Sequence, residues 1–189
     1  MNKRRPIVPW FIVSSLTACS ASAERRLEDH VFHIPKANDI SDSDAPFFLP
    51  ALDPNDGFSF YLNPKASLPE RNLVGVASKN RMCARAAGTA AQINSTVCTI
   101  RPLSWRDRSF RRVGDDVFWT YDLPAEIGRK SPAPLASCFA MSGGTRSGLC
   151  TASLPYGDLV LTVHFRDSQI GSLHALYDQA TASLRKWQR

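Results

Sequence analysis

Cysteine is the residue type with the clearest chemistry in this sequence of 189 residues, which contains five cysteines. Cys19 lies near the N-terminus, and Cys83, Cys98, Cys138 and Cys150 follow. The four later cysteines are an even number, which suits disulfides in an oxidising compartment. Proximity in the sequence favours Cys83 with Cys98 and Cys138 with Cys150. Each bond would close a loop of about 15 residues and stabilise the fold by about 3 kcal/mol.

A zinc site is the alternative use of these four cysteines. Such sites normally use close C-x-x-C pairs, and this sequence has none. We therefore expect two disulfides, no bound metal and no cofactor.

Histidines and a glycine-rich segment are the candidates for a catalytic site. The segment from Gly144 to Gly148 reads G-x-x-S-G, one residue out of register for the G-x-S-x-G nucleophile motif. His30 and His33 lie three apart in a predicted strand and so point to opposite faces. His164 and His174 fall on different predicted elements, and we expect none of the four scattered histidines to have a close acidic or cysteine partner. The sequence thus predicts a protein that is not an enzyme.

The N-terminus reads as an export signal. Lys3, Arg4 and Arg5 form a positive start, and an apolar run from Ile7 to Leu16 follows. A membrane-spanning helix needs roughly 20 apolar residues, so this run is too short to be one. We expect residues 1–18 to be removed during secretion.

Two cleavage signals overlap after the apolar run. Leu16-Thr-Ala-Cys19 resembles the lipid-attachment motif of bacterial lipoproteins, whereas Ala21-Ser-Ala23 suits an ordinary signal peptidase. The position of Cys19 at the end of the apolar run favours the lipid. The resemblance implies a lipidated Cys19 on the periplasmic face of a membrane, and Ser20 after the cysteine implies the outer membrane. We expect residues 19–29 to form a lipidated tether and residues 30–189 one disulfide-stabilised domain.

Charge argues against nucleic acid as the partner. The formal charge of +6 includes Lys3, Arg4 and Arg5, so loss of the signal lowers it by three, to about +3. Five of the remaining basic residues fall within twelve positions, from Arg101 to Arg112. Arginines here suit either a strand edge protected by charge or a docking surface for an acidic partner. Trp105, Arg106 and Arg108 are the candidate partner-binding residues.

Hydrophobic periodicity predicts a sheet followed by a helix. Leu159 to Phe165 alternates apolar and polar, and apolar residues from Ile170 to Trp187 recur at helical spacing. A weaker helix is expected at residues 81–92, and the hairpin around Gly114 is expected to place arginines on one side and aromatics on the other. The fold class is α+β, an antiparallel sheet packed by a C-terminal amphipathic helix. The predicted strands cover residues 30–34, 57–62, 73–77, 109–113, 117–123, 138–141, 149–153 and 159–165.

The C-terminal third carries a family resemblance. The order Cys138 to Cys150, then the strand at Tyr156–Phe165, then the helix at Leu173–Leu184 resembles small exported immunity proteins of proteobacteria. These proteins are commonly lipoproteins that neutralise antibacterial toxins of secretion systems. The resemblance implies a protein that binds and occludes a toxin in the periplasm. The alternative function is an envelope-maintenance lipoprotein that stabilises an outer-membrane assembly.

Overall fold

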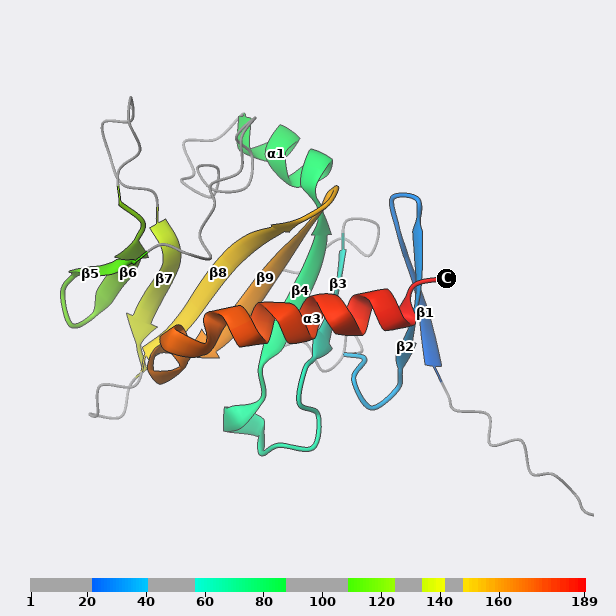
Figure 1. The fold of residues 1–189 in the computed structure, drawn as a ribbon, viewed down its shortest axis with the longest axis horizontal. Helices are drawn as coiled ribbons and strands as arrows, with labels where there is room; N and C mark the ends of the chain where they lie inside the picture. The colour runs from blue at the N-terminus through cyan, green and yellow to red at the C-terminus, as the bar shows by residue number, and fades with distance from the viewer. Residues whose placement is uncertain (1–21, 41–56, 88–108, 125–133, 142–147) are drawn as a thin grey trace, which may run out of the picture.

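A computed structural model describes residues 22–40, 57–87, 109–124, 134–141 and 148–189. These residues form an α+β fold with a seven-stranded antiparallel sheet, a separate two-stranded hairpin and a C-terminal helix (Figure 1). The sequence predicted this class. None of the described helices has both the length and the apolar character needed to cross a bilayer.

The seven-stranded sheet has the order β3-β4-β9-β8-β7-β6-β5, so within the described residues β3 and β5 are its edges. Every neighbouring pair is antiparallel. In chain order the elements are β1 (Ser22–Leu27), β2 (His30–Pro35), β3 (Gly57–Tyr61), η1 (Leu68–Glu70), β4 (Leu73–Ser78), α1 (Lys79–Ala87), β5 (Arg111–Gly114), β6 (Phe118–Asp122), β7 (Pro134–Ala140), β8 (Gly148–Tyr156), β9 (Leu159–Arg166), η2 (Asp167–Ser172) and α3 (Leu173–Trp187).

One face of the sheet forms the core. On β9, Leu159, Leu161, Val163 and Phe165 are at most 1% exposed, whereas Thr162 between them is half-buried. This period of two places the four apolar side chains on one face, which we call the inner face. Helix α3 crosses the sheet in Figure 1, and its buried apolar residues belong to the same hydrophobic cluster. The buried residues of α3 are Leu173, Leu176, Ala180, Thr181, Leu184 and Trp187. We call the opposite side of the sheet the outer face.

The folded part of the chain includes residues that the sequence assigned to the tether. Ser22–Leu27 forms β1, which pairs with β2 in an antiparallel hairpin through the two-residue turn at Glu28 and Asp29. Glu28 adopts a φ of 50°, the left-handed conformation that two-residue hairpins require. Leu27 is buried in the main core, so this hairpin packs against the rest of the protein.

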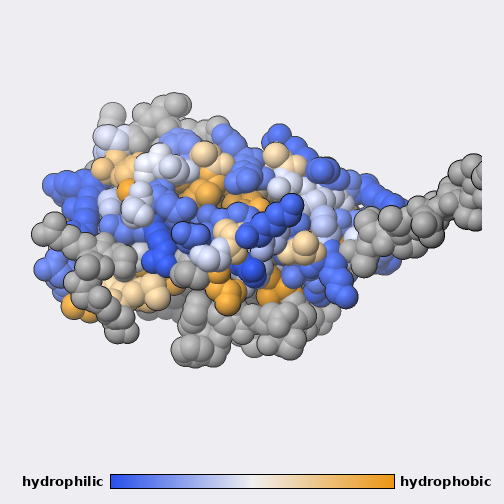
Figure 2. Space-filling model, turned by 90° about the horizontal axis from the view of Figure 1, so that it is seen from below, coloured by the Kyte–Doolittle hydropathy of each residue, from blue (hydrophilic) through white to orange (hydrophobic). Residues whose placement is uncertain are grey.

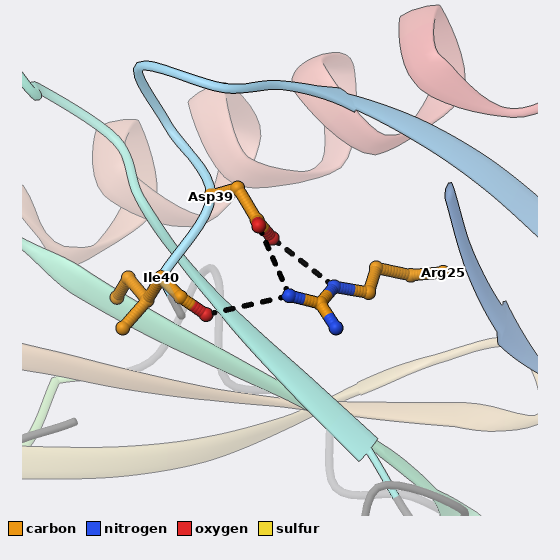
Figure 3. Close-up of polar contacts among 3 residues, drawn as sticks. All are labelled: Arg25, Asp39 and Ile40. Carbon is orange, nitrogen blue, oxygen red and sulfur yellow. Dashed lines mark hydrogen bonds and ion pairs between the residues drawn. The ribbon is translucent and has the colours of Figure 1, made fainter. Parts of the chain in front are cut away.

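An ion pair between an arginine and a carboxylate also fixes strand β1 of this hairpin (Figure 3). Arg25 donates from Nε to Asp39 Oδ1 at 3.1 Å and from Nη2 to Asp39 Oδ2 at 3.0 Å. The same Nη2 lies 3.5 Å from the carbonyl oxygen of Ile40. Two parallel bonds of this kind constrain geometry more strongly than a single ion contact. They hold β1 against the segment that follows β2, where Asp39 also bridges to Phe60 of β3.

The weaker predicted helix begins two residues earlier than expected. Helix α1 runs from Lys79 to Ala87, and residues 88–92 of the predicted helix lie outside the described residues. Ser78 caps it, because its Oγ accepts a hydrogen bond from the backbone amide of Arg81 at 3.1 Å. The carboxylate of Glu28 also contacts this hydroxyl, so the turn of the N-terminal hairpin meets the start of α1.

Candidate functional site

Exposed hydrophobic side chains gather at one end of the sheet. Six large ones are exposed among the described residues, and five of these lie on or beside β5, β6 and β7. Phe118 is 54% exposed and Phe139 is 46% exposed, and Val113, Val117 and Met141 are exposed beside them. We call Val113, Phe118, Phe139 and Met141 the outer apolar patch. A grouped apolar surface of this kind is typical of a contact site for another macromolecule.

Strand register places the patch on the outer face. Phe118 lies opposite Phe139, and Phe139 lies opposite Leu149 of β8. Residues directly opposite in an antiparallel pair share a face, so these three side chains form one row. Trp119, the next residue after Phe118, is only 3% exposed and belongs to the core. Figure 2 shows hydrophobic groups reaching the surface among hydrophilic ones at the end of the molecule where β5 and β6 lie.

The two arginines of β5 correct a prediction about this hairpin. Arg111 shares the outer face with Val113, whereas the Arg112 guanidinium lies 4.4 Å from the ring centroid of Trp119. The expected division, with arginines on one side and aromatics on the other, is therefore wrong, because consecutive residues of a strand point to opposite faces. Since β5 is an edge strand, its arginines fit the account of an edge protected by charge.

The turn between β5 and β6 fixes the position of the patch. Gly114 has a φ of 126°, and a Cβ there would come within 2.5 Å of the carbonyl oxygen of Phe118. Asp115 Oδ1 accepts hydrogen bonds from the amides of Val117 at 2.8 Å and Phe118 at 2.7 Å. These bonds lower the pKa of the Asp115 carboxyl, because they stabilise its charged form. The hairpin thus has a turn that only glycine suits well, closed by an ionised carboxylate.

Asp167 supports the hairpin from the inner face. Its Oδ1 accepts hydrogen bonds from Trp119 Nε1 at 2.9 Å and from the Tyr121 hydroxyl at 2.8 Å. Burial raises the pKa of Tyr121 to about 12, and the hydrogen bond to Asp167 adds to this effect. The carboxylate therefore links β6 to η2, the segment that leads into α3. These hydrogen bonds hold β6 in place from the inner face, opposite the exposed patch.

A disulfide lies beside this carboxylate. Cys138 and Cys150 are directly opposite on β7 and β8 and are joined by an S–S bond of 2.01 Å, the pairing favoured by sequence proximity. Cys150 Sγ lies 3.7 Å from Asp167 Oδ1. The two sulfurs and this carboxylate are close enough together to resemble a metal site, but sulfurs bonded to each other offer no thiolate.

The second predicted disulfide is only partly within the described residues. One complete disulfide is described, and two were predicted. Cys83 lies on α1 and is disulfide-bonded, while its predicted partner Cys98 lies outside the described residues. Cys19, Trp105, Arg106 and Arg108 also lie outside them, so their roles stay predictions.

A small pocket adjoins the patch. Its volume is about 190 Å³, and Met141 and Leu149 line it on the side of the patch. Arg71, His164 and Arg166 also line it. Burial lowers the pKa of His164 to about 4, so this ring is neutral at pH 7. The lining residues are Tyr61, Leu68, Glu70, Arg71, Asn72, Leu73, Met141, Leu149, His164, Phe165, Arg166 and Gln169.

One histidine has the acidic partner that the sequence did not reveal. His30 Nε2 lies 2.8 Å from Asp158 Oδ1, and these residues are 128 positions apart. The expectation that no histidine has a close acidic partner is therefore wrong for His30. Gln188 Nε2 lies 2.9 Å from the other ring nitrogen, Nδ1. The imidazole thus joins β2, the turn before β9 and the end of α3.

Comparisons with known proteins find one similar solved structure. No family model matches the chain, and no curated protein matches it. The chain is similar to the solved structure of an immunity protein of the type IV secretion system of Stenotrophomonas maltophilia. The identity is 10%, the TM-score is 0.48, and the match covers 90% of this chain and 94% of that chain.

Proposed function

We propose that this chain is an exported immunity protein that binds an antibacterial toxin and occludes it without catalysis. The observation that carries the proposal is the outer apolar patch, in which Phe118 and Phe139 are exposed side by side. Exposed aromatic side chains are among those that contribute most to protein interfaces. The partner is a protein, because the patch is a row across neighbouring strands of a sheet, where another protein surface can pack.

The size of the adjoining pocket agrees with binding rather than turnover. Its volume of about 190 Å³ is below the roughly 300 Å³ typical of small-molecule sites. The ionisable His164 in its wall is neutral at pH 7, and its Nδ1 lies 3.3 Å from Thr151 Oγ1. This hydroxyl and imidazole lack a described carboxylate that would complete a Ser-His-Asp type of relay.

Protection from a toxin tests the proposed function. Cells that lack this protein should be killed when a neighbour delivers the toxin encoded beside it to the periplasm, and the wild-type chain should restore survival. A Phe118→Ser and Phe139→Ser double variant should accumulate normally but fail to protect. Its affinity for the purified toxin should fall at least about 30-fold, because truncating interface aromatics of this kind costs about 2 kcal/mol or more.

The matched control is Gln179→Ser, an exposed position on α3 and thus on the inner side of the sheet. This variant should protect as the wild type does. Full protection by the double variant, or recovery of only envelope-assembly components with the purified chain, would overturn the immunity proposal. The second outcome would favour the envelope-maintenance alternative.

We further propose that the chain is anchored by lipid on Cys19 at the periplasmic face of the outer membrane. Strand β1 supports this choice of cleavage site. Ser22 and Ala23 pair with Pro35 and Ile34 of β2, so cleavage after Ala23 would remove two residues of the strand. Cleavage before Cys19 keeps β1 whole and leaves two residues between the lipidated cysteine and the strand.

A Cys19→Ala variant tests the anchor. The variant should lose labelling by radioactive palmitate and should move from the membrane fraction to the soluble fraction, because the thioether cannot form without the thiol. Since the lipid chains supply about 0.8 kcal/mol for each buried methylene group, their loss removes the attachment as a whole. A Cys19→Ala protein that stays in the membrane fraction would show that another segment holds it there.

A further inference from the structure

The pocket and the outer apolar patch form one continuous surface. Met141 belongs to both, and Leu149 lies opposite Phe139 in the strand register. Leu149 also lies opposite Arg166 of β9, which lines the pocket. A partner that covers Phe118 and Phe139 therefore reaches the mouth of the pocket without a gap in the contact.

The volume of the pocket limits what can enter it. At about 190 Å³ it exceeds the cavity of about 150 Å³ that is known to admit benzene. It is smaller than the roughly 300 Å³ of ordinary small-molecule sites. The pocket thus has room for one aromatic ring. Its apolar walls, which include Leu73, Met141 and Leu149, suit that ring.

Arg71 gives this pocket a charge preference. Its Nε donates to the carbonyl oxygen of Ala66 at 3.0 Å, and its guanidinium carbon lies 5.3 Å from the ring centroid of Tyr61. These contacts hold the guanidinium in place, and its Nη groups form no hydrogen bond with the described part of the chain. A guanidinium held in this way presents donors that match a carboxylate.

The wall of the pocket also contains a second arginine, a carboxylate and a histidine. Arg166 adds a second cation to its wall, and Glu70 adds one carboxylate, whose Oε2 accepts a hydrogen bond from Ser67 Oγ at 2.8 Å. His164 is neutral at pH 7, because burial lowers its pKa to about 4. Glu70 is thus engaged by a hydroxyl, and the guanidinium of Arg71 is the charged group that favours a negatively charged occupant.

We propose that this pocket receives one aromatic side chain of the protein partner, and that a carboxylate next to that side chain pairs with Arg71. The proposal rests on the proposed function, because it assigns a recognition element to the same partner. It identifies the partner segment by its chemistry, an aromatic residue flanked by Asp or Glu. Such an anchor in a pocket beside a flat apolar surface is the usual arrangement of an interface hot spot.

Peptide titrations followed by amide NMR test this proposal. The probe is the capped tripeptide Asp-Phe-Asp, and the comparison peptides are Lys-Phe-Lys and Asp-Gly-Asp. The acidic aromatic peptide should shift the amide signals of Arg71, Asn72, Met141 and Leu149 in the full exported protein. Each comparison peptide should bind about tenfold more weakly or worse, since one lacks the carboxylates and the other lacks the ring.

Two variants and a control separate the contribution of the Arg71 charge to peptide binding from that of the space in the pocket. Arg71→Gln should abolish the preference for Asp-Phe-Asp over Lys-Phe-Lys, whereas Lys65→Gln should keep it, because Lys65 is an exposed cation of the same loop that does not line the pocket. Leu149→Trp should fill the pocket and abolish the peptide shifts. The amide spectrum of each variant reports directly whether it is folded.

Equal shifts with the acidic and basic peptides, or shifts confined to residues away from the pocket, would overturn the pocket proposal. This result is separable from the proposed function. If Asp-Phe-Asp fails while the Phe118 and Phe139 double variant still loses protection, only the pocket proposal falls. If the peptide binds as expected while the double variant still protects, the proposed function falls.

Discussion

Replacement of Trp119 by alanine is expected to lower the free energy of unfolding by about 3–5 kcal/mol, the usual cost of removing a buried tryptophan side chain. The indole is 3% exposed, and Gly148 packs so closely against it that a Cβ at Gly148 would lie 2.3 Å from ring carbons. Loss of the ring would also remove the Nε1 donor at 2.9 Å from Asp167. The variant should therefore unfold at a clearly lower urea concentration.

Two neighbouring substitutions serve as controls for this experiment. Trp119→Phe keeps an aromatic ring but lacks the indole donor, so it should cost less, about 1–2 kcal/mol plus a small packing loss. Phe118→Ala removes an aromatic ring from the adjacent position, but this ring is 54% exposed, so stability should change by no more than about 0.5 kcal/mol. Equal destabilisation by Trp119→Ala and Phe118→Ala would contradict the assignment of inner and outer faces.

The stability of the wild-type protein is expected to fall as the pH drops from about 6.5 to about 4, and His164 should be one cause. Burial lowers the pKa of this imidazole from 6.5 to about 4. Between these values the unfolded chain binds a proton at His164 that the folded chain does not, so acid favours unfolding. This contribution to the free energy of unfolding is fully present above pH 6.5 and is lost as the pH falls from about 6.5 to about 4. Its size is on the order of 2–3 kcal/mol.

A His164→Gln variant isolates this contribution. Chemical denaturation of both proteins at pH 8 and at pH 4.5 gives the loss of unfolding free energy for each. The fall in unfolding free energy from pH 8 to pH 4.5 should be smaller in the variant than in the wild type by on the order of 2–3 kcal/mol. This difference does not depend on how much the substitution destabilises the protein at pH 8. An identical loss in the two proteins would show that His164 can take up a proton in the folded state without cost.

Local patterns predicted most of the described strands, and the clearest signal is a side-chain period of two, as in β8 and β9. The segment Leu159–Arg166 alternates clearly, and β9 follows it. The alternation of faces along a strand also puts the consecutive residues Phe118 and Trp119 on opposite faces. This alternation is the sequence signal that could have revealed the outer apolar patch. The sequence prediction instead treated the aromatics of the hairpin as one buried group.

Strand β1 was missed for a different reason. Its turn contains Glu28 and Asp29 instead of the Asn-Gly or Asp-Gly that usually indicates a hairpin, and Glu28 takes the left-handed conformation despite its side chain. The strand has only one buried apolar residue, Leu27. Its stability comes from pairing with β2 and from the bonds of Arg25 to Asp39, and neither has a local signal.

The polar links of the site could not be predicted from local sequence. Asp167 is 48 residues from Trp119, and His30 is 128 residues from Asp158. Contacts of this kind depend on the strand order, which places the hairpin of β5 and β6 beyond β7 rather than beside β4. Among the links of the site, the disulfide between Cys138 and Cys150 could be predicted from the sequence, because the two strands that carry it are consecutive.

The N-terminal hairpin also meets the other end of the chain. Phe32 bridges to Gln188, and the amide of Arg189 donates to the carbonyl oxygen of Val31 at 3.2 Å. In Figure 1 this junction lies at one end of the molecule, and β5 and β6 lie at the opposite end. A lipid on Cys19 would therefore hold the junction next to the bilayer and turn the hairpin of β5 and β6 away from it. The long axis of the protein would then point from the membrane into the periplasm, with the aromatic end outermost, where an incoming toxin would meet it first.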